Sequence, residues 1–341
     1  PPPPPPPPIF FFNQKTESEI GVRLVGSEMC IRDRYNLIVI MSNNLNVKVP
    51  ATSANMGPGF DCLGIALDIW NSVSILDHSD DTTKVVVVGN GEEELERGSG
   101  NLVFQAFSRV FTEIGRDVPN VTLNCENKIP LSRGLGSSSA AIVGGLVLGN
   151  EYAGKPFNKN ELAIIAAEME GHPDNVVPAC LGGMQIVIYD EDELVTASVP
   201  ISKDISAVLY VPDVPMPTEK SRNLLGEKIF RQDAVFNIGR SALLIQSLLT
   251  GELSNLKYAT QDMLHQPDRQ KIFFPMKNIL RAAMESGALG AFLSGAGSTI
   301  LAICTDREYT IGYEMADAAM KSGISGEILV TKPSFIGAHL G

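Results

Sequence analysis

The chain has 341 residues, 44% of them hydrophobic and 19% charged, so it is long enough for two domains that each bury a core. Its 27 Lys and Arg against 39 Asp and Glu give a formal net charge of −12, which argues against electrostatic binding to nucleic acid or to an anionic membrane. If phosphate is bound, backbone amides and a metal must neutralise much of its charge. Apolar runs such as 85–88 are far shorter than the roughly 20 apolar residues of a membrane span, so no span is predicted.

Residues 1–40 differ in character from the rest of the chain. They begin with eight prolines followed by phenylalanines at positions 10–12, and no amphipathic period or alternation precedes Met41. A signal peptide would instead begin with basic residues before an apolar stretch. We expect a non-native or disordered leader, such as a translated upstream segment, with a proline-rich ligand segment as the alternative. A chain that begins at Met41 is expected to keep full activity.

The remainder alternates between strand-like and helix-like patterns. One helix fits 161–170, because Asn158 and Glu161 are spaced as a capping box and Gly171 ends the pattern. Other helices are predicted at 102–114, 218–225, 234–249, 276–286 and 313–320. Strands are predicted at 45–49, 63–76, 85–88, 121–125, 182–189, 206–211, 290–293 and 299–304.

This mixture of elements is typical of the α+β class. The segment 190–204 is charged and weakly patterned, so we place a domain boundary there, with one domain over 41–200 and a second over 201–341. The five cysteines, at positions 30, 62, 125, 180 and 304, are widely spaced and form no CxxC pair. This spacing disfavours a disulfide framework or a zinc site and favours reduced thiols in the cytoplasm.

The most informative segment is 130–140, PLSRGLGSSSA, which leads into a run of small residues. Gly134 and Gly136 permit backbone torsions and close approaches that side chains forbid, and a helix beginning at the serines would present unpaired amides to an anion. No Lys follows, so this is not a Walker loop. Two alternatives remain: a glycine turn that caps a tightly packed helix, and a serine-hydrolase elbow with Ser138 as nucleophile. The elbow is disfavoured because no apolar strand directly precedes it.

Three other segments carry polar side chains between apolar elements. The loop 50–64 holds Asn55 and Asp61 among glycines and prolines. Segment 166–176 ends an apolar helix with two carboxylates and adds a histidine and an asparagine. Segment 292–299, FLSGAGST, is a second glycine turn, and it is expected to shape the substrate side of a cleft.

Together these motifs resemble the GHMP kinase superfamily of galactokinase, homoserine kinase, mevalonate kinase and phosphomevalonate kinase. The form of the 50–64 loop, His-Pro-Asp-Asn at 172–175 and Pro-x-Pro-Thr-x-x-x-Arg at 215–222 resemble its homoserine kinases in particular. The resemblance covers residues 41–341. It implies a two-domain GHMP-kinase-like α+β fold, with an N-terminal nucleotide-binding domain and a C-terminal ferredoxin-like domain. It also implies transfer of a phosphoryl group from ATP to the hydroxyl of L-homoserine, in threonine biosynthesis, by a possible homodimer.

The resemblance implies that the loop holds the triphosphate of ATP and that Ser138 faces Mg²⁺. The residues concerned are Pro130, Leu131, Ser132, Arg133, Gly134, Leu135, Gly136, Ser137, Ser138, Ser139 and Ala140. Asn101 matches an adenine or ribose contact, with a helix N-cap as the alternative. Another small-molecule kinase of the superfamily is the nearest alternative function, and a nucleotide-binding sensor without turnover is a more distant one.

Two carboxylates compete for the metal. Glu168 matches the Mg²⁺ ligand of the family, and it shares a helix face with the apolar Ile164 and Ile165. Glu170 is the competitor, but its place at the helix end predicts an exposed side chain. We therefore assign the metal to Ser138 and Glu168, and we count Glu168, Ser138 and Asn55 as catalytic.

The amino-acid substrate is a zwitterion. By resemblance, Arg222 and Arg269 bind its carboxylate, Asp61 and Asn55 its ammonium and hydroxyl, and Asn175 and His172 close the pocket. As alternatives, the asparagines fix loop backbones and His172 is structural. We assign no general base; Asp174 is the motif carboxylate nearest to that role, and it could equally be structural.

Overall fold

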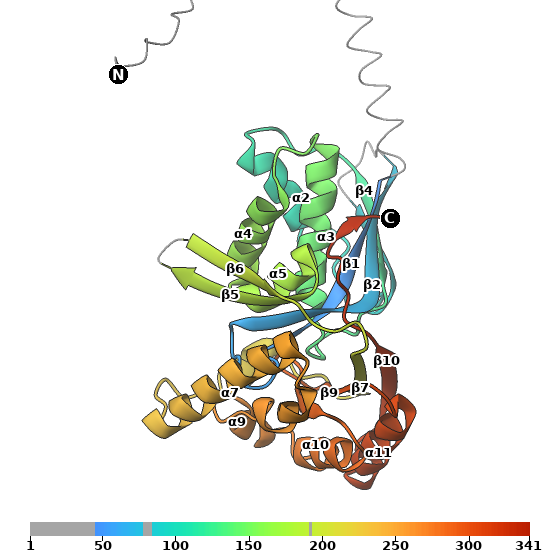
Figure 1. The fold of residues 1–341 in the computed structure, drawn as a ribbon. Coiled ribbons are helices and arrows are strands. Elements are labelled where there is room, and N and C mark those ends of the chain that lie inside the picture. Colours follow the sequence, from blue (N-terminus) through green and yellow to red (C-terminus); the bar gives the residue numbers. More distant parts are fainter. Residues whose placement is uncertain (1–44, 78–83, 191–192) are drawn as a thin grey trace, which may run out of the picture. The chain divides into compact units, whose positions relative to one another are not determined.

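A computed structural model of the chain describes residues 45–77, 84–190 and 193–341 (Figure 1). The leader predicted at 1–40 lies outside these residues. Within the described ranges, none of the helices has the length and apolar character needed to cross a membrane.

The first 200 residues, joined by β11 from the carboxyl end of the chain, build a seven-stranded sheet in which the order β11-β1-β2-β4-β3 is extended by β5 and β6 beside β2. β2 is the central strand, because it pairs with β1, β4 and β5, all antiparallel. In β3, Val85 and Val87 are buried whereas Val86 and Val88 are exposed, so this strand covers the core with one face. The strands are β1 Asn46–Ala54, β2 Leu63–Asp77, β3 Lys84–Gly89, β4 Thr122–Asn127, β5 Met184–Asp190, β6 Glu193–Val199 and β11 His339–Leu340.

Four helices lie together on one side of β1 and β2 (Figure 1). They are α2 Leu102–Glu113, α3 Ser137–Tyr152, α4 Lys159–Glu170 and α5 Pro173–Leu181. The middle helix, α3, is buried along most of its length because its small residues let neighbours approach. A Cβ added to Gly145 would lie 2.2 Å from the carbonyl oxygen of Val103 in α2. Close packing of α2 therefore fixes the direction in which the amino end of α3 points.

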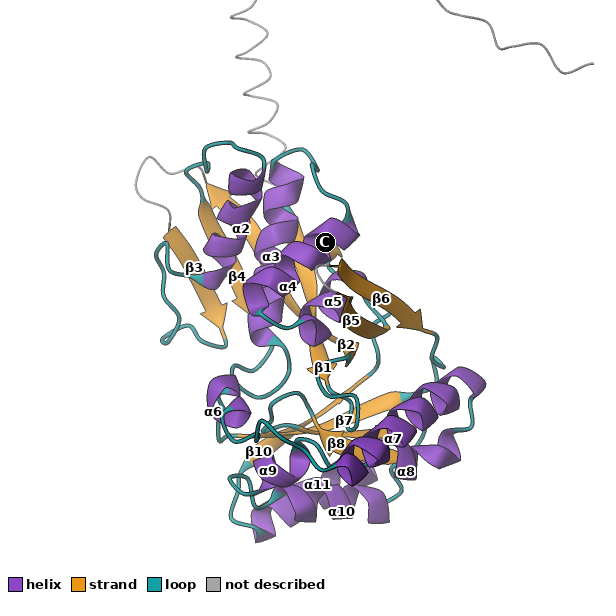
Figure 2. Ribbon diagram, turned by 90° about the vertical axis from the view of Figure 1, so that its left-hand side faces the viewer, coloured by secondary structure: helices purple, strands orange, loops and turns teal. Residues whose placement is uncertain are grey.

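The second half builds a four-stranded antiparallel sheet of order β10-β7-β9-β8. Every residue of β7 is buried, because α10 and α11 cover one face and the core of the first sheet, with α7, covers the other. In Figure 2 this sheet lies between α2–α5 above and α10 and α11 below. The elements are β7 Ser206–Pro212, α6 Thr218–Arg222, α7 Arg231–Thr250, η2 Leu253–Asn255, α8 Leu256–Ala259, α9 Gln266–Gln270, α10 Met276–Glu285, β8 Gly290–Leu293, β9 Ile300–Cys304, α11 Glu308–Lys321 and β10 Gly326–Thr331.

The expected α+β class is confirmed, and so is the capping box of Asn158 and Glu161 at α4. The main error concerns the charged segment 190–204, which contains β6 and not only a connection. Its residues alternate between half-buried and exposed at an edge of the sheet, where charged side chains are compatible with a strand. The short elements α5, α8, α9 and β10 were not predicted. The domain boundary near residue 200 stays a prediction.

Candidate active site

A cavity of about 390 Å³ lies where the amino end of α3 meets the loops of the second sheet. It is lined by every predicted site residue except Pro130, Ala140 and Glu168. Residues from the two halves of the chain thus line one cavity: the Gly/Ser loop from the first half, and Arg222, Arg269 and Gly295 from the second.

The loop 130–140 has the backbone of an anion site. Gly134 and Gly136 have φ values of 75° and 68°, which L side chains rarely adopt. A Cβ on Gly134 would lie 2.1 Å from the carbonyl oxygen of Ser294, so the loop is also too tightly packed for a side chain there. Helix α3 starts at Ser137 without a side-chain cap, and its first-turn N–H groups have no partner within the helix. These amides at the positive end of the helix suit a phosphate.

Arg133 has a structural role. Its guanidinium donates to three backbone carbonyls, those of Leu131 at 2.9 Å, Pro212 at 2.7 Å and Asp213 at 2.5 Å. The Arg133 side chain thereby links the loop 130–140 to the end of β7. Any contact of Arg133 with phosphate is therefore expected from its backbone.

Glu168, which the sequence assigns to the metal, does not line the cavity. The Glu168 side chain is 56% exposed and pairs with Arg109 at 3.0 Å outside the cavity. Glu170, only 10% exposed, accepts hydrogen bonds from Ser138 Oγ at 2.9 Å and from Ser139 Oγ at 3.2 Å. Although Glu170 ends α4, α3 packs beside that end and keeps the carboxylate in the cavity. Ser138 was therefore correctly placed in the cavity, but its carboxylate partner is Glu170.

A histidine and an aspartate face the same cavity from the amino end of α5. His172 Nδ1 lies 3.3 Å from Asp174 Oδ1, and His172 Nε2 lies 4.0 Å from Glu170 Oε1. Burial alone would lower the pKa of His172, but these two carboxylates outweigh it and raise the pKa above its ordinary value.

Asp61 and Arg222 form a two-pronged ion pair at the cavity wall. Arg222 Nη1 donates to Asp61 Oδ2 at 3.1 Å, and Nη2 donates to Oδ1 at 2.8 Å. The guanidinium lies over the ring of Phe60, 5.9 Å from its centroid. Asp61 has a φ of 57°, a conformation held by the hydrogen bond from its N–H to Asn55 Oδ1 at 3.0 Å.

Asn55 and Asn101 make the backbone contacts that their structural alternatives predict, and Asn175 contacts a side chain; all three line the cavity. Asn55 also donates from Nδ2 to the carbonyl of Gly295 at 3.0 Å, so both ends of its amide hold backbone groups. Asn175 Oδ1 accepts from Thr52 Oγ1 at 2.8 Å. Asn101 caps α2 by accepting from the N–H of Val103 at 2.9 Å.

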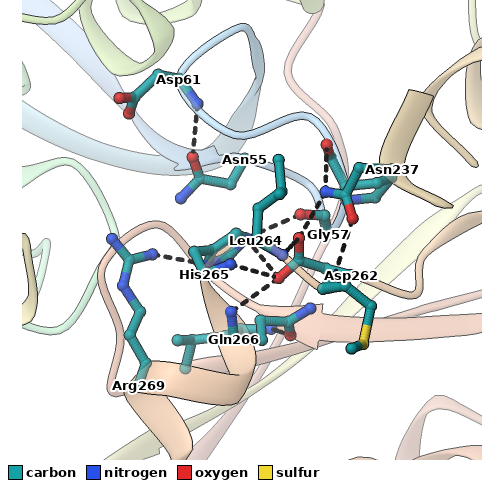
Figure 3. Close-up of polar contacts among 12 residues, drawn as sticks. Asn55, Gly57, Asp61, Asn237, Asp262, Leu264, His265, Gln266 and Arg269 are labelled. Atoms are coloured by element: carbon teal, nitrogen blue, oxygen red, sulfur yellow. Dashed lines mark hydrogen bonds and ion pairs between the residues drawn. The ribbon is translucent and has the colours of Figure 1, made fainter. Parts of the chain in front are cut away.

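Arg269 is 1% exposed and is held from two sides (Figure 3). Its Nη1 donates to the carbonyl of Gly295 at 2.8 Å and lies 2.8 Å from His265 Nδ1. Burial and the nearby Arg222 charge lower the pKa of Arg269 to about 10, so the group stays protonated at neutral pH. His265, with its neighbour Asp262, was not predicted as part of the site; its only signal was its position four residues before Arg269.

Comparison with known proteins gives matches along most of the chain. Residues 101–183 match the family model for the GHMP kinases N terminal domain, and residues 244–318 match the GHMP kinases C terminal model. The chain is 42% identical over 284 residues to the homoserine kinase of Desulfitobacterium hafniense, covering 83% of this chain and 95% of that protein. It is 38% identical over 292 residues to the homoserine kinase of Carboxydothermus hydrogenoformans, covering 86% and 95%.

Among solved structures, the homoserine kinase from Cytophaga hutchinsonii superposes with a TM-score of 0.79. It is 27% identical in sequence, and the match covers 87% of this chain and 97% of that one.

Proposed function

Because this chain belongs to the homoserine kinase family of the GHMP kinases, we propose that it transfers the γ-phosphoryl group of ATP to the side-chain hydroxyl of L-homoserine. The product would be O-phospho-L-homoserine, on the route to threonine. One observation carries the proposal: a helix-terminal Gly/Ser loop and two arginines from the other half of the chain line one cavity.

The loop and the start of α3 are suited to the triphosphate. In a chain with a net charge of −12, the amides of the first turn of α3 supply positive potential without adding charged side chains. Beside them, the carboxylate of Glu170 and the hydroxyl of Ser138 form a set of hard oxygen donors in a shielded position. This set fits Mg²⁺, which takes a few protein oxygens and completes its shell with water and phosphate. When bound, Mg²⁺ would offset the negative charge of the transferring phosphoryl group.

Another part of the cavity, lined by Asp61, Arg222 and Arg269, is suited to an amino acid. Arg222 and Arg269 provide guanidinium groups for the carboxylate, and Asp61 provides an anion for the ammonium group. Asp61 and Arg222 pair with each other, so each keeps the other oriented. A zwitterion can take up both partners at once, because it brings the opposite charge to each.

Transfer of the γ-phosphoryl group would depend on the alignment of ATP with the homoserine hydroxyl. The hydroxyl oxygen of homoserine forms a bond to the γ-phosphorus, the bond to the β,γ-bridging oxygen breaks, and ADP leaves with that electron pair. In a loose transition state the hydroxyl proton departs late, so positioning by the two parts of the cavity supplies much of the acceleration. Asp174 and His172 are titratable motif residues that line the cavity, and we assign neither as a base.

The hydrolase alternative finds no support in the geometry. Ser138 Oγ donates to the carboxylate of Glu170, and within the described residues no hydrogen bond joins it to a histidine. A nucleophilic serine would need such a base. The cytoplasmic location and the homodimer expected above stay predictions.

A coupled assay of ADP release with L-homoserine, L-serine, mevalonate and galactose tests the proposal. We expect turnover with L-homoserine and much less with the other three. Release of ADP that does not depend on L-homoserine, or a preference for mevalonate or galactose, would overturn it.

A further inference from the structure

A buried polar cluster surrounds the substrate-facing Arg269, and the proposed reaction uses no other member of it. It consists of Asn237 from α7, Asp262 and His265 from the loop before α9, and Arg269 from α9 (Figure 3). Each of these residues is at most 8% exposed, and Arg269 and His265 are 1% and 0% exposed. Polar groups so deeply buried are costly unless each is paired.

Asp262 anchors the cluster. Its carboxylate accepts four hydrogen bonds: from Asn237 Nδ2 at 2.6 Å and from the backbone N–H groups of Leu264, His265 and Gln266 at 2.9, 3.0 and 2.7 Å. Four donors fill the lone pairs of an ionised carboxylate. The turn that carries His265 is thereby fixed.

The contacts of the His265 ring define its tautomer. Nδ1 lies 2.8 Å from Arg269 Nη1, which can only donate, so Nδ1 must accept and carry no proton. Nε2 lies 2.8 Å from the carbonyl oxygen of Gly57 and 3.5 Å from Asp262 Oδ2, both acceptors, so Nε2 carries the proton. Burial, with Arg269 nearby, lowers the pKa of His265 to about 4, in keeping with a neutral ring.

The ring therefore bridges two segments that face the substrate. Through Nε2 it holds the loop that carries Asn55 and Asp61, and through Nδ1 it holds Arg269. The carbonyl oxygen of Gly295 links the same two segments a second time, because it accepts from both Asn55 Nδ2 at 3.0 Å and Arg269 Nη1 at 2.8 Å. The ring also stacks on Phe60, with centroids 5.4 Å apart.

These contacts occupy one end of the Arg269 guanidinium, Nη1, and do not involve the other end. Both N–H bonds of Arg269 Nη1 are taken, one by His265 and one by Gly295. Arg269 Nε is buried and has no hydrogen-bond partner in the described part of the chain, and no hydrogen bond or ion pair of Nη2 is found there. Nε and Nη2 form the edge of a guanidinium that binds a carboxylate through two parallel hydrogen bonds.

We propose that His265 is a positioning residue that holds Arg269 by Nη1 and so presents its Nε–Nη2 edge to the carboxylate of the amino-acid substrate. This inference rests on the proposed function, because it assumes that Arg269 binds that carboxylate. Without the acceptor at Nδ1, Arg269 could rotate and satisfy Nη1 elsewhere, and the edge would lose its orientation.

Two substitutions at His265 test the hydrogen bonds of Nδ1 and Nε2 separately. In His265→Asn the amide oxygen can take the place of Nδ1, whereas in His265→Gln the amide N–H can take the place of Nε2 and the acceptor for Arg269 is lost. We expect His265→Gln to raise the KM for homoserine about tenfold or more, with the KM for ATP unchanged. His265→Asn should restore the KM for homoserine to within about threefold of wild type, because it keeps the hydrogen bond to the charged group. His339→Gln, the same change outside the cavity, is the matched control.

Equal KM values in the Asn and Gln variants, or equal rises for ATP and homoserine, would show a merely structural role. A double-mutant cycle adds a second readout: His265→Gln should have no further effect on the KM for homoserine in an Arg269→Lys background, since it acts through Arg269. Independent effects of the two changes would overturn the proposal.

Two measurements on the wild-type chain do not depend on a variant that folds. Long-range ¹H–¹⁵N spectra should show an unprotonated Nδ1 and a protonated Nε2 for His265 between about pH 6 and 8, and the opposite tautomer or a cation would contradict the proposal.

Calorimetric titration with L-homoserine in the presence of ADP tests the proposed function and the positioning role separately. A wild-type chain that binds ADP but no homoserine would overturn the proposed function and this inference together. Equal homoserine binding by wild type and His265→Gln would overturn only the positioning role.

Discussion

The carboxylate of Glu170, the last residue of α4, accepts the hydrogen bond of Ser138 Oγ at 2.9 Å, in the first turn of α3. Two helices thereby bring a carboxylate and a hydroxyl to the place where amides point at the cavity. Glu168, two residues earlier, faces solvent on the other side of α4 and pairs with Arg109. This contrast between neighbouring glutamates gives the most direct test of the site.

Glu170→Gln should lower kcat about 100-fold or more, because it removes the charge of the carboxylate beside the loop 130–140. Glu168→Gln is the matched control and should stay near wild type, since an exposed ion pair contributes at most about 1 kcal/mol. ADP release at saturating ATP and L-homoserine measures both. Ser138→Ala should weaken turnover as well. Full activity in Glu170→Gln, or loss of activity in Glu168→Gln alone, would mean that the carboxylate has been misassigned.

Arg222→Lys should raise the KM for L-homoserine about tenfold and leave the KM for ATP unchanged, because a lysine cannot make the two parallel bonds of a guanidinium. Arg109→Lys, which changes an exposed arginine outside the cavity, is its control. Steady-state kinetics with each substrate varied in turn distinguishes the two effects. A parallel rise in both KM values would place Arg222 in loop structure and not in substrate binding.

His172 should make the stability of the protein depend on pH. Its folded pKa lies above the ordinary 6.5 because the carboxylates of Asp174 and Glu170 outweigh the effect of burial, so the folded state binds the proton more tightly than the unfolded state. The resulting stabilisation is fully present below about pH 6.5 and is lost as the pH rises through the folded pKa. Urea unfolding of wild type and His172→Gln at several pH values should therefore give a difference in free energy that shrinks as the pH rises. A difference that grows with pH would contradict the sign of this shift.

Gly134→Ala should destabilise the fold more than Gly251→Ala, although the two glycines have similar φ values of 75° and 78°. A Cβ at Gly251 meets nothing within 4 Å, so only the backbone torsion opposes the change, by about 1–2 kcal/mol. At Gly134 the Cβ would also lie 2.1 Å from the carbonyl of Ser294, and overpacking adds about 1–3 kcal/mol. Urea unfolding measures the difference, and equilibrium binding of ADP should weaken only in Gly134→Ala. Equal losses of stability would show that the loop can relax around a methyl group.

The sequence was a poor guide to which side of α4 faces the site. The sequence favours Glu168 by family resemblance and because Glu168 shares a helix face with the apolar Ile164 and Ile165, but Ile164 is 38% exposed, so that spacing does not mark a buried face. Glu170 was judged solvated because it ends the helix. The αL turn at Gly171, with a φ of 82°, leads directly into α5, and the Glu170 side chain beside it is only 10% exposed.

The sequence by itself determined the backbone of the loop 130–140, because the features that shape it are local: two glycines with positive φ and a helix start lie within eleven consecutive residues. It also named both arginines through short motifs. Only the tertiary structure decided which groups meet them, since Arg222 lies 161 positions from Asp61, and Asn55 lies 240 positions from Gly295. Contacts over such separations depend on how two sheets and their helices pack, and side-chain spacing along one element does not encode that. The positioning role proposed for His265 can be inferred only from the tertiary structure. The tautomer of this buried ring depends on three partners, Gly57, Asp262 and Arg269, which lie at separate places in the sequence.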